Sequence, residues 1–214
     1  MSEIPSVRES LNYDDINQII INNYSAFTKE YTTFLSEWLT DTNKIFKDSE
    51  KFYILIYIFN KNLEFFNNNL IEFDYVAFDQ TAKFDIQKIN IVEIAKNLNI
   101  AKETTRRKII ELENTGVIKR KKKQILIDKS SFVLFDIKNT IKSLTILLFK
   151  IYNICVQEGI ITKKITKDEI NDLMEKKFSF IMYHYFEFII PWTTRWKKFF
   201  DNDIELLIIW GVIV

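Results

Sequence analysis

The sequence predicts a mainly helical fold that carries one small β-hairpin. Only three glycines and two prolines occur in 214 residues, which favours long helices with short connections. Apolar residues recur at steps of three and four over much of the chain, as on the buried face of a helix. Between residues 90 and 128, two short helical patterns are followed by two short strands separated by a run of basic residues.

The first of these short helices begins after Asn90, which can cap it, with Glu93 three residues later as in a capping box. Its apolar residues share one face at the i, i+3, i+4, i+7 spacing: Ile91, Ile94, Ala95 and Leu98. Asn99 and Ile100 are expected to form the turn that follows. We expect the apolar Ile100 to fill the space between the two helices.

The second helix is predicted from about Lys102 to Asn114. The residues expected to face the core are Thr105, Ile109, Leu112 and the stem of Lys108. Gly116 follows the last apolar position, where a left-handed helix cap is favoured. These features define where the helix ends and where a strand can begin.

A hairpin is predicted next, with one strand starting at Val117 and the other returning at 125–127. Its tip, residues 119–123, is entirely basic. A buried helix over about 49–67, apolar on all sides, would support the pair of short helices. This order of elements predicts a winged helix-turn-helix, namely three helices plus a small β-hairpin wing, with long flanking helices. Such a unit places its second short helix in the major groove of DNA and its wing on the phosphate backbone.

The distribution of charge favours DNA over a protein partner for this segment. From Lys96 to Lys129 there are eleven Lys and Arg against four Asp and Glu, a net charge of +7 in a chain of net charge +1. Positive charge is therefore concentrated where a phosphate backbone would lie. The expected DNA-contacting residues are Lys102, Glu103, Thr104, Arg106, Arg107, Lys119, Arg120, Lys121, Lys122 and Lys123. Among them, Arg107 is the best candidate for a bidentate contact with guanine.

The segment IAKETTRRKIIELENTGVIKR resembles the recognition helix of winged-helix bacterial transcription regulators, especially the Crp/Fnr group. The residues that match its base-contacting or phosphate-contacting positions are Lys102, Glu103, Thr104 and Arg107, and those that match core and cap positions are Leu112, Glu113, Gly116, Val117 and Ile118. Ala101 stands where serine is usual, and Thr105 replaces an apolar residue. The match covers about 35 of the 214 residues. It implies a regulator that binds double-stranded DNA, and the helical flanks are similar to those that form the dimer in the MarR group.

The flanks themselves resemble each other. An aromatic-rich stripe over residues 14–39 predicts one long amphipathic helix, and residues 166–192 repeat the stripe 154 positions later. Aligned without gaps, residues 11–60 and 165–214 share eleven identities in fifty, including Trp38 with Trp192. We favour an internal duplication over a chance likeness of two amphipathic helices. Between the flanks we expect a short strand within 70–89, and a helix from Ile137 to Gln157 that ends before Gly159.

The resulting organisation has four parts: an N-terminal helical region (1–48), the winged helix-turn-helix (49–130), a connecting helix (131–160) and the start of a second copy (161–214). On this interpretation the sequence is a fragment, and a second helix-turn-helix is expected near residues 244–282. We expect either a homodimer or an intramolecular pseudo-dimer that includes this second unit.

The sequence lacks the usual marks of catalysis. It has no glycine-rich phosphate loop and no Cys/His ligand cluster, so we expect no enzyme activity, no cofactor and no metal. The single cysteine, Cys155, is expected to be a buried filler, and the single histidine, His184, a packed or surface residue. With no signal peptide and no apolar run of about 18 residues, we expect a cytoplasmic, nucleoid-associated protein without membrane contact.

Two other functions stay open. A winged helix can act as a protein-interaction or assembly module without DNA, in which case exposed aromatic residues such as Trp38 would matter more than Arg107. The chain could also be a ligand-gated regulator, with an effector pocket between the aromatic helices lined by Tyr24, Phe27 and Tyr31.

Overall fold

Helix α3 (Ser49–Asn68) is the central element of the fold, and other elements pack on both of its sides. The computed structural model describes residues 12–81, 83–87, 90–121, 124–128 and 137–213. Every residue from Phe52 to Asn60 is buried, as expected for a helix that is apolar on all sides. Its N-terminus is capped by Asp48, whose carboxylate accepts the Lys51 N–H at 3.2 Å.

The described chain is mainly helical. Before the helix-turn-helix segment, the helices are α1 (Tyr13–Asn22), α2 (Tyr24–Phe46), α3 and the short α4 (Tyr75–Gln80). The segment itself contains α5 (Ile91–Leu98) and α6 (Lys102–Asn114). The remaining helices are α8 (Ile137–Gln157), α9 (Lys167–Lys176), α10 (Phe178–Trp196), the 3-10 helix η2 (Lys197–Phe200) and α11 (Ile204–Ile213).

Three short strands form one antiparallel sheet in the order β1-β3-β2. They are β1 (Lys83–Gln87), β2 (Ile118–Lys121) and β3 (Gln124–Asp128). β2 and β3 form a hairpin in which Ile118 pairs with Ile127, and β1 joins the other edge of β3. The sequence predicted a short strand before Asn90, and β1 is that strand; helix α4, directly before it, was not predicted.

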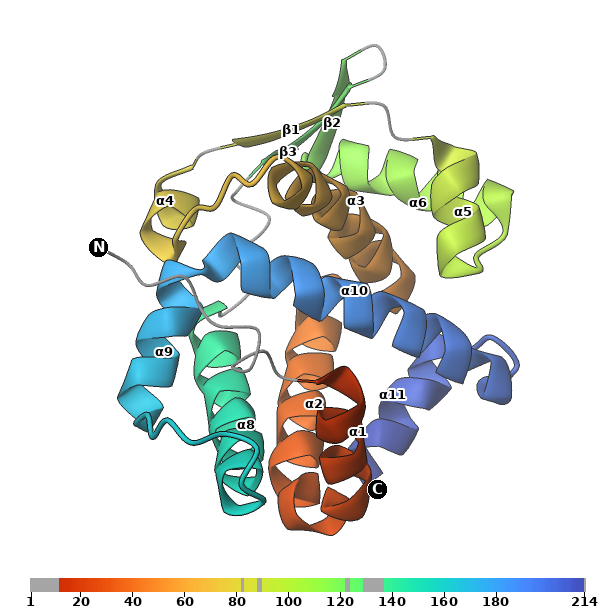
Figure 1. The fold of residues 1–214 in the computed structure, drawn as a ribbon. Helices are drawn as coiled ribbons and strands as arrows, with labels where there is room; N and C mark the ends of the chain where they lie inside the picture. Colours follow the sequence, from red (N-terminus) through yellow and green to blue (C-terminus); the bar gives the residue numbers. More distant parts are fainter. Residues whose placement is uncertain (1–11, 82, 88–89, 122–123, 129–136, 214) are drawn as a thin grey trace.

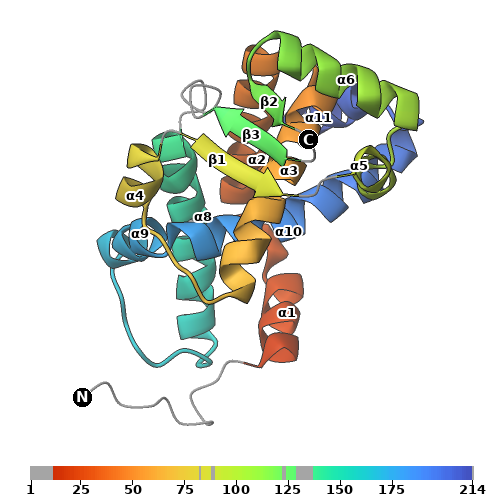
Figure 2. The same ribbon diagram turned by 90° about the horizontal axis from the view of Figure 1, so that it is seen from above.

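The elements lie in two tiers with α10 running between them. In Figure 1, α5, α6 and the sheet form the upper tier on α3, and α1, α2, α8 and α9 form the lower tier. Figure 2, seen from above, shows the sheet beside α6 and over α3. The upper tier therefore rests on α3, which in turn packs along α10.

Aromatic side chains fill much of the core between the tiers. Trp38 of α2 meets Phe52 of α3 at a ring distance of 5.3 Å and Tyr185 of α10 at 5.8 Å, both edge to face. Phe178, at the start of α10, packs on Phe78 of α4 at 4.7 Å. These contacts join helices that are far apart in the sequence into one core.

Each of the two predicted long flanking helices is broken into two, so the prediction of single helices was wrong. The first break is at Asn23, with φ −111° and ψ 18°, and the second at Lys177, with φ −105° and ψ 29°. At the first break, the Ile19 carbonyl accepts both the Asn23 N–H at 2.9 Å and the Asn23 side-chain amide at 3.1 Å. The apolar stripe cannot reveal such a break, because its phase continues across a single residue.

The two broken flanks agree in their boundaries. α1 and α9 begin 154 residues apart, as do α2 and α10, and the two breaks are also 154 residues apart. Their packing is reciprocal as well: α3, which follows α2, packs on α10, whereas α11, which follows α10 and η2, packs on α2. Helix α8 contacts both α1 and α9.

The predictions for α8, Cys155 and His184 agree with the structure. Helix α8 has the predicted ends, and Gly159 beyond it has a left-handed φ of +77°. Cys155 is buried, and burial raises the pKa of its thiol. His184 lies on the surface against the ring of Phe180.

Candidate nucleic-acid interface

Helix α5 is fixed to the rest of the fold through its apolar face and its cap. The Asn90 side chain accepts the Val92 N–H at 2.9 Å, which confirms the predicted cap. Ile94 and Leu98 are buried against the core. The Glu93 carboxylate accepts instead from the Tyr57 hydroxyl of α3 at 3.0 Å, so it binds α5 to α3 rather than closing a capping box.

The turn between α5 and α6 is tight because Asn99 adopts a left-handed conformation, with φ +51°. The Ile100 N–H donates to the Ala95 carbonyl at 3.0 Å, and the Ile100 side chain is buried as predicted. Two residues beyond α10 also hold this turn. The buried Lys197 donates to the Asn99 carbonyl at 2.9 Å, and the Asn99 amide donates to Asn202 at 2.8 Å.

Helix α6 has a buried face and an exposed face. The buried side chains are those predicted, namely Thr105, Ile109 and Leu112. Thr105 is fully buried, and its hydroxyl donates to the Ala101 carbonyl at 3.1 Å. That bond explains how a threonine can occupy a position where apolar residues are usual. The exposed face carries Lys102, Glu103, Arg106 and Arg107.

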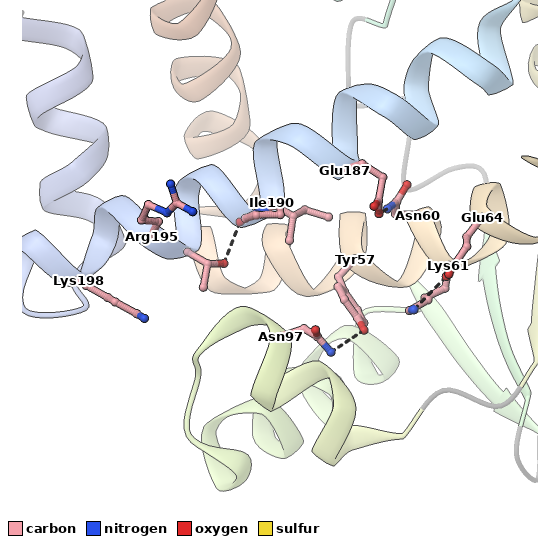
Figure 3. A pocket seen from close by; sticks show the side chains of 11 residues that line it. Tyr57, Asn60, Lys61, Glu64, Asn97, Glu187, Ile190, Arg195 and Lys198 are labelled. Carbon is pink, nitrogen blue, oxygen red and sulfur yellow. Dashed lines mark hydrogen bonds and ion pairs between the residues drawn. The ribbon is translucent and has the colours of Figure 1, made fainter. Parts of the chain in front are cut away.

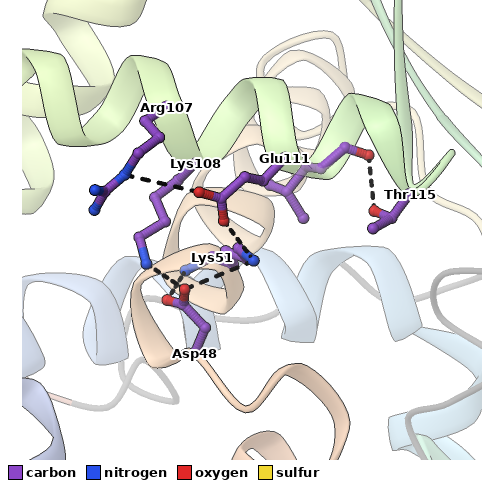
Figure 4. Close-up of polar contacts among 7 residues, drawn as sticks. Asp48, Lys51, Arg107, Lys108, Glu111 and Thr115 are labelled. Atoms are coloured by element: carbon purple, nitrogen blue, oxygen red, sulfur yellow. Dashed lines mark hydrogen bonds and ion pairs between the residues drawn. The ribbon is translucent and has the colours of Figure 1, made fainter.

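An ion-pair network ties α6 to the N-terminus of α3 (Figure 4). Lys108, with a side chain only 14% exposed, pairs with Asp48, the cap of α3. Lys51 bridges the two helices by pairing with Glu111 of α6 at 2.6 Å. Glu111 also lies 3.7 Å from Arg107, and the hydrogen bond from Lys51 keeps the Glu111 pKa below its usual value. The network leaves the Arg107 side chain 66% exposed.

In the hairpin beside α6, the structure describes the side chains of two of the predicted cations, Lys119 and Arg120. Lys119 is exposed. Arg120 is exposed but pairs with Glu113 of α6, to which its Nε donates at 2.6 Å. That pair raises the pKa of Arg120 and balances its charge. Lys122 and Lys123 lie outside the described residues, as does the side chain of Lys121.

The structure therefore brings together the described members of the predicted site. Lys102, Glu103, Arg106 and Arg107 share the outer face of α6, Thr104 is half-buried beside them, and β2 follows α6 directly. Sequence reasoning missed Asp48 and Lys197, which position α6 and the turn. The capping position of Asp48 before an apolar helix was a usable signal, whereas nothing in the sequence placed Lys197 near Asn99.

Two helices joined by a tight turn, seated on a third helix and followed by a strand pair, define the helix-turn-helix class of domains. Comparison with protein families agrees with this class: residues 85–127 match the family model of the DeoR-like helix-turn-helix domain. Over this segment the chain is similar to DeoR-like domains, and the finer resemblance to the Crp/Fnr and MarR groups stays a prediction. Comparisons with curated proteins and with solved structures find no match.

Within residues 12–213, apart from the gaps given above, no helix is long and apolar enough to cross a membrane. The same part of the chain contains no group of three or more His, Cys, Asp or Glu placed to hold a metal ion.

Proposed function

We propose that this protein is a sequence-specific DNA-binding transcriptional regulator. The observation that carries the proposal is the exposed outer face of α6, where three cations, Lys102, Arg106 and Arg107, project from a helix whose opposite face is buried. A helix held in this way can enter the major groove without disturbing the core. The similarity of residues 85–127 to DeoR-like domains supports the same function.

In this proposal the residues have separate roles. Arg107 contacts guanine in the major groove, and Lys102, Glu103 and Arg106 contact base edges or nearby phosphates. Thr104 and the hairpin residues 119–123 act as a wing on the phosphate backbone. Because Arg120 is already paired with Glu113, we assign it a smaller part of the backbone contact than Lys119.

We further propose that the chain contains an internal duplication, in which α9, α10 and α11 repeat α1, α2 and the start of α3. The equal spacing of the helix boundaries and the reciprocal packing of α3 on α10 and α11 on α2 support it. A pair of related units offers a scaffold for two reading heads, either within one polypeptide or in a homodimer. Dimers of this class read two half-sites about one turn of DNA apart.

The alternative functions have less support. Trp38, the exposed aromatic residue expected for a protein-interaction module, is only 8% exposed and belongs to the core. Phe27 is also buried and meets Tyr24 edge to face at 5.5 Å, which counts against an effector cavity at that end of α2.

Selection of bound duplexes from a random pool, followed by fluorescence anisotropy on the selected sequence, tests the proposal. Arg107→Ala is expected to weaken binding by about 1–3 kcal/mol and to relax the preference at one base pair. Lys119→Gln is expected to weaken all duplexes alike and to lower the slope of log affinity against log salt by about one.

The exposed Lys142 of α8 lies in the lower tier, so Lys142→Gln serves as the matched control for lost charge. If Lys142→Gln and Lys119→Gln change the salt slope equally, the hairpin is not part of the interface. If the selection returns no preferred sequence and Arg107→Ala leaves affinity unchanged, α6 is not a recognition helix.

A further inference from the structure

A polar pocket of about 470 Å³ lies between α3, α5 and the α10–η2 segment (Figure 3). This volume falls in the range of roughly 300–1,000 Å³ found for small-molecule sites. Four of its lining residues, Glu187, Pro191, Thr194 and Lys198, follow one another at steps of three and four, so they share one face of the α10–η2 segment. Asn97 of α5 lines the opposite side.

One end of the pocket gathers hydrogen-bond acceptors. The Glu187 carboxylate is exposed and accepts from the Asn60 amide at 2.8 Å. Asn60 is only 6% exposed, and within the described part of the chain its Oδ1 has no donor. Pro191 lies inside α10 and has no N–H, so the Glu187 carbonyl lacks its usual helical donor. The Glu187 carboxylate and the Asn60 amide oxygen, as acceptors from two lining side chains, suit an ammonium group, which carries three donors.

The other end of the pocket offers cations. Arg195 and Lys198 are exposed, and among the residues that the structure describes neither has an ion-pair partner. Lys61, also in the lining, lies at the opposite end near Asn60, where it pairs with Glu64 at 2.9 Å and with Glu93 at 3.4 Å (Figure 3). Figure 3 shows Lys198 reaching toward α5, far from Glu187 and Asn60. Free cations at this end suit a carboxylate.

The distance between the two ends limits the ligand. Glu187 and Arg195 are eight residues apart on α10, which corresponds to roughly 12 Å along the helix axis. Glycine is too short to reach both ends. We propose that the pocket binds a small extended zwitterion, with its ammonium group at Glu187 and Asn60 and its carboxylate at Lys198 and Arg195.

The pocket also touches the elements that hold the reading helix. Asn97 donates to the Tyr57 hydroxyl at 3.0 Å, and Lys197, next to Lys198, donates to the carbonyl of Asn99 in the turn. A ligand held by α3, α10 and η2 lies beside Asn97 of α5 and contacts Lys198, the neighbour of Lys197, so it alters how the turn and α6 are seated. If the proposed DNA-binding function holds, the zwitterion is an effector that changes DNA affinity.

Isothermal titration calorimetry with 6-aminohexanoate as the probe tests the site on the full chain. Hexanoate and hexylamine, each lacking one charged end, serve as control ligands. Glu187→Gln and Lys198→Gln are expected to weaken binding of the probe by about tenfold or more, because each removes a charge-assisted contact. Exposed charges outside the pocket provide the matched variants Glu205→Gln and Lys142→Gln, which are expected to bind like the original chain.

Saturable binding of 6-aminohexanoate, lost in both pocket variants and weaker for hexanoate and hexylamine, supports the proposal. No saturable binding, or equal binding of hexylamine, overturns it, and thermal unfolding shows whether each variant is folded. DNA affinity is then measured by anisotropy with and without the probe. Probe binding that leaves DNA affinity unchanged overturns the role as effector, whereas a chain that binds no duplex overturns the proposed function and leaves the calorimetric result standing.

Discussion

The pair between Lys108 and Asp48 ties α6 to the N-terminus of α3, and its strength can be measured. Asp48 caps α3, so Asp48→Ala removes the cap, a loss of about 1 kcal/mol. The same change leaves Lys108 without its main partner, although the side chain is only 14% exposed. Exposed ion pairs contribute about 0–1 kcal/mol and buried ones considerably more when one partner is removed. We therefore expect Asp48→Ala to lower the unfolding free energy by about 2 kcal/mol.

A double-mutant cycle separates the ion pair from the cap. Lys108→Met keeps most of the buried stem, and the cycle of Lys108→Met with Asp48→Ala is expected to give a coupling energy of about 1 kcal/mol. The exposed pair of Lys177 with Glu72, whose side chains are 49% and 44% exposed, provides the control cycle. For that pair we expect less than about 0.5 kcal/mol. Urea unfolding followed by circular dichroism measures both, and equal coupling energies would refute the argument from burial.

Two further predictions concern the core. Thr105→Val is expected to change the unfolding free energy by less than about 1 kcal/mol, because the Ala101 carbonyl also accepts the Thr105 N–H at 2.9 Å and so keeps a donor. Thr105→Ala removes buried atoms, so it is expected to lower the unfolding free energy clearly more than Thr105→Val in the same urea titration. Burial, with the nearby Tyr24 second, raises the pKa of Tyr31 to about 12. The folded state therefore keeps this proton between pH 10 and about 12, where the unfolded chain loses it, so stability falls as the pH rises through that window. Tyr31→Phe is expected to make the fall shallower in urea titrations at pH 9 and 11, and an unchanged slope would show that Tyr31 does not contribute.

The helix-turn-helix segment was predictable because its signals are local. The cap at Asn90, the apolar face of α5 and the glycine after α6 each depend on neighbours within a turn or two, and Gly116 has the expected left-handed φ of +78°. The breaks at Asn23 and Lys177 were not predictable, since an apolar stripe keeps its phase across one residue. Contacts such as Lys197 with Asn99 depend on how α10 crosses the fold, and sequence periodicity carries no information about that.

The charge of the predicted interface shows a second limit of sequence reasoning. A count of Lys and Arg treats Arg120 and Lys119 as equal. Arg120, however, is paired with Glu113 of α6, whereas Lys119 has no ion-pair partner among the described residues. A paired arginine must give up its carboxylate, or keep it close to the phosphates, before it can bind DNA. The sequence count therefore overstates the charge that Arg120 can offer to a duplex, whereas Lys102, Arg106 and Arg107 are exposed on the outer face of α6.

The turn between α5 and α6 connects the proposed DNA-binding helix to the proposed ligand pocket. The turn is held from α5 by its left-handed Asn99 and from the far side of the fold by Lys197 and Asn202, which follow α10. Lys197 is 3% exposed, and burial lowers the pKa of its ammonium group. Removing this ammonium group from water costs free energy, and its hydrogen bond to the Asn99 carbonyl offsets part of that cost. A contact of this kind persists only if α10 and η2 keep their place, and the proposed zwitterion pocket is formed by those same elements. The pocket and the orientation of α6 therefore both depend on the position of α10 and η2. This shared dependence is the physical reason to expect that a ligand in the pocket changes DNA affinity.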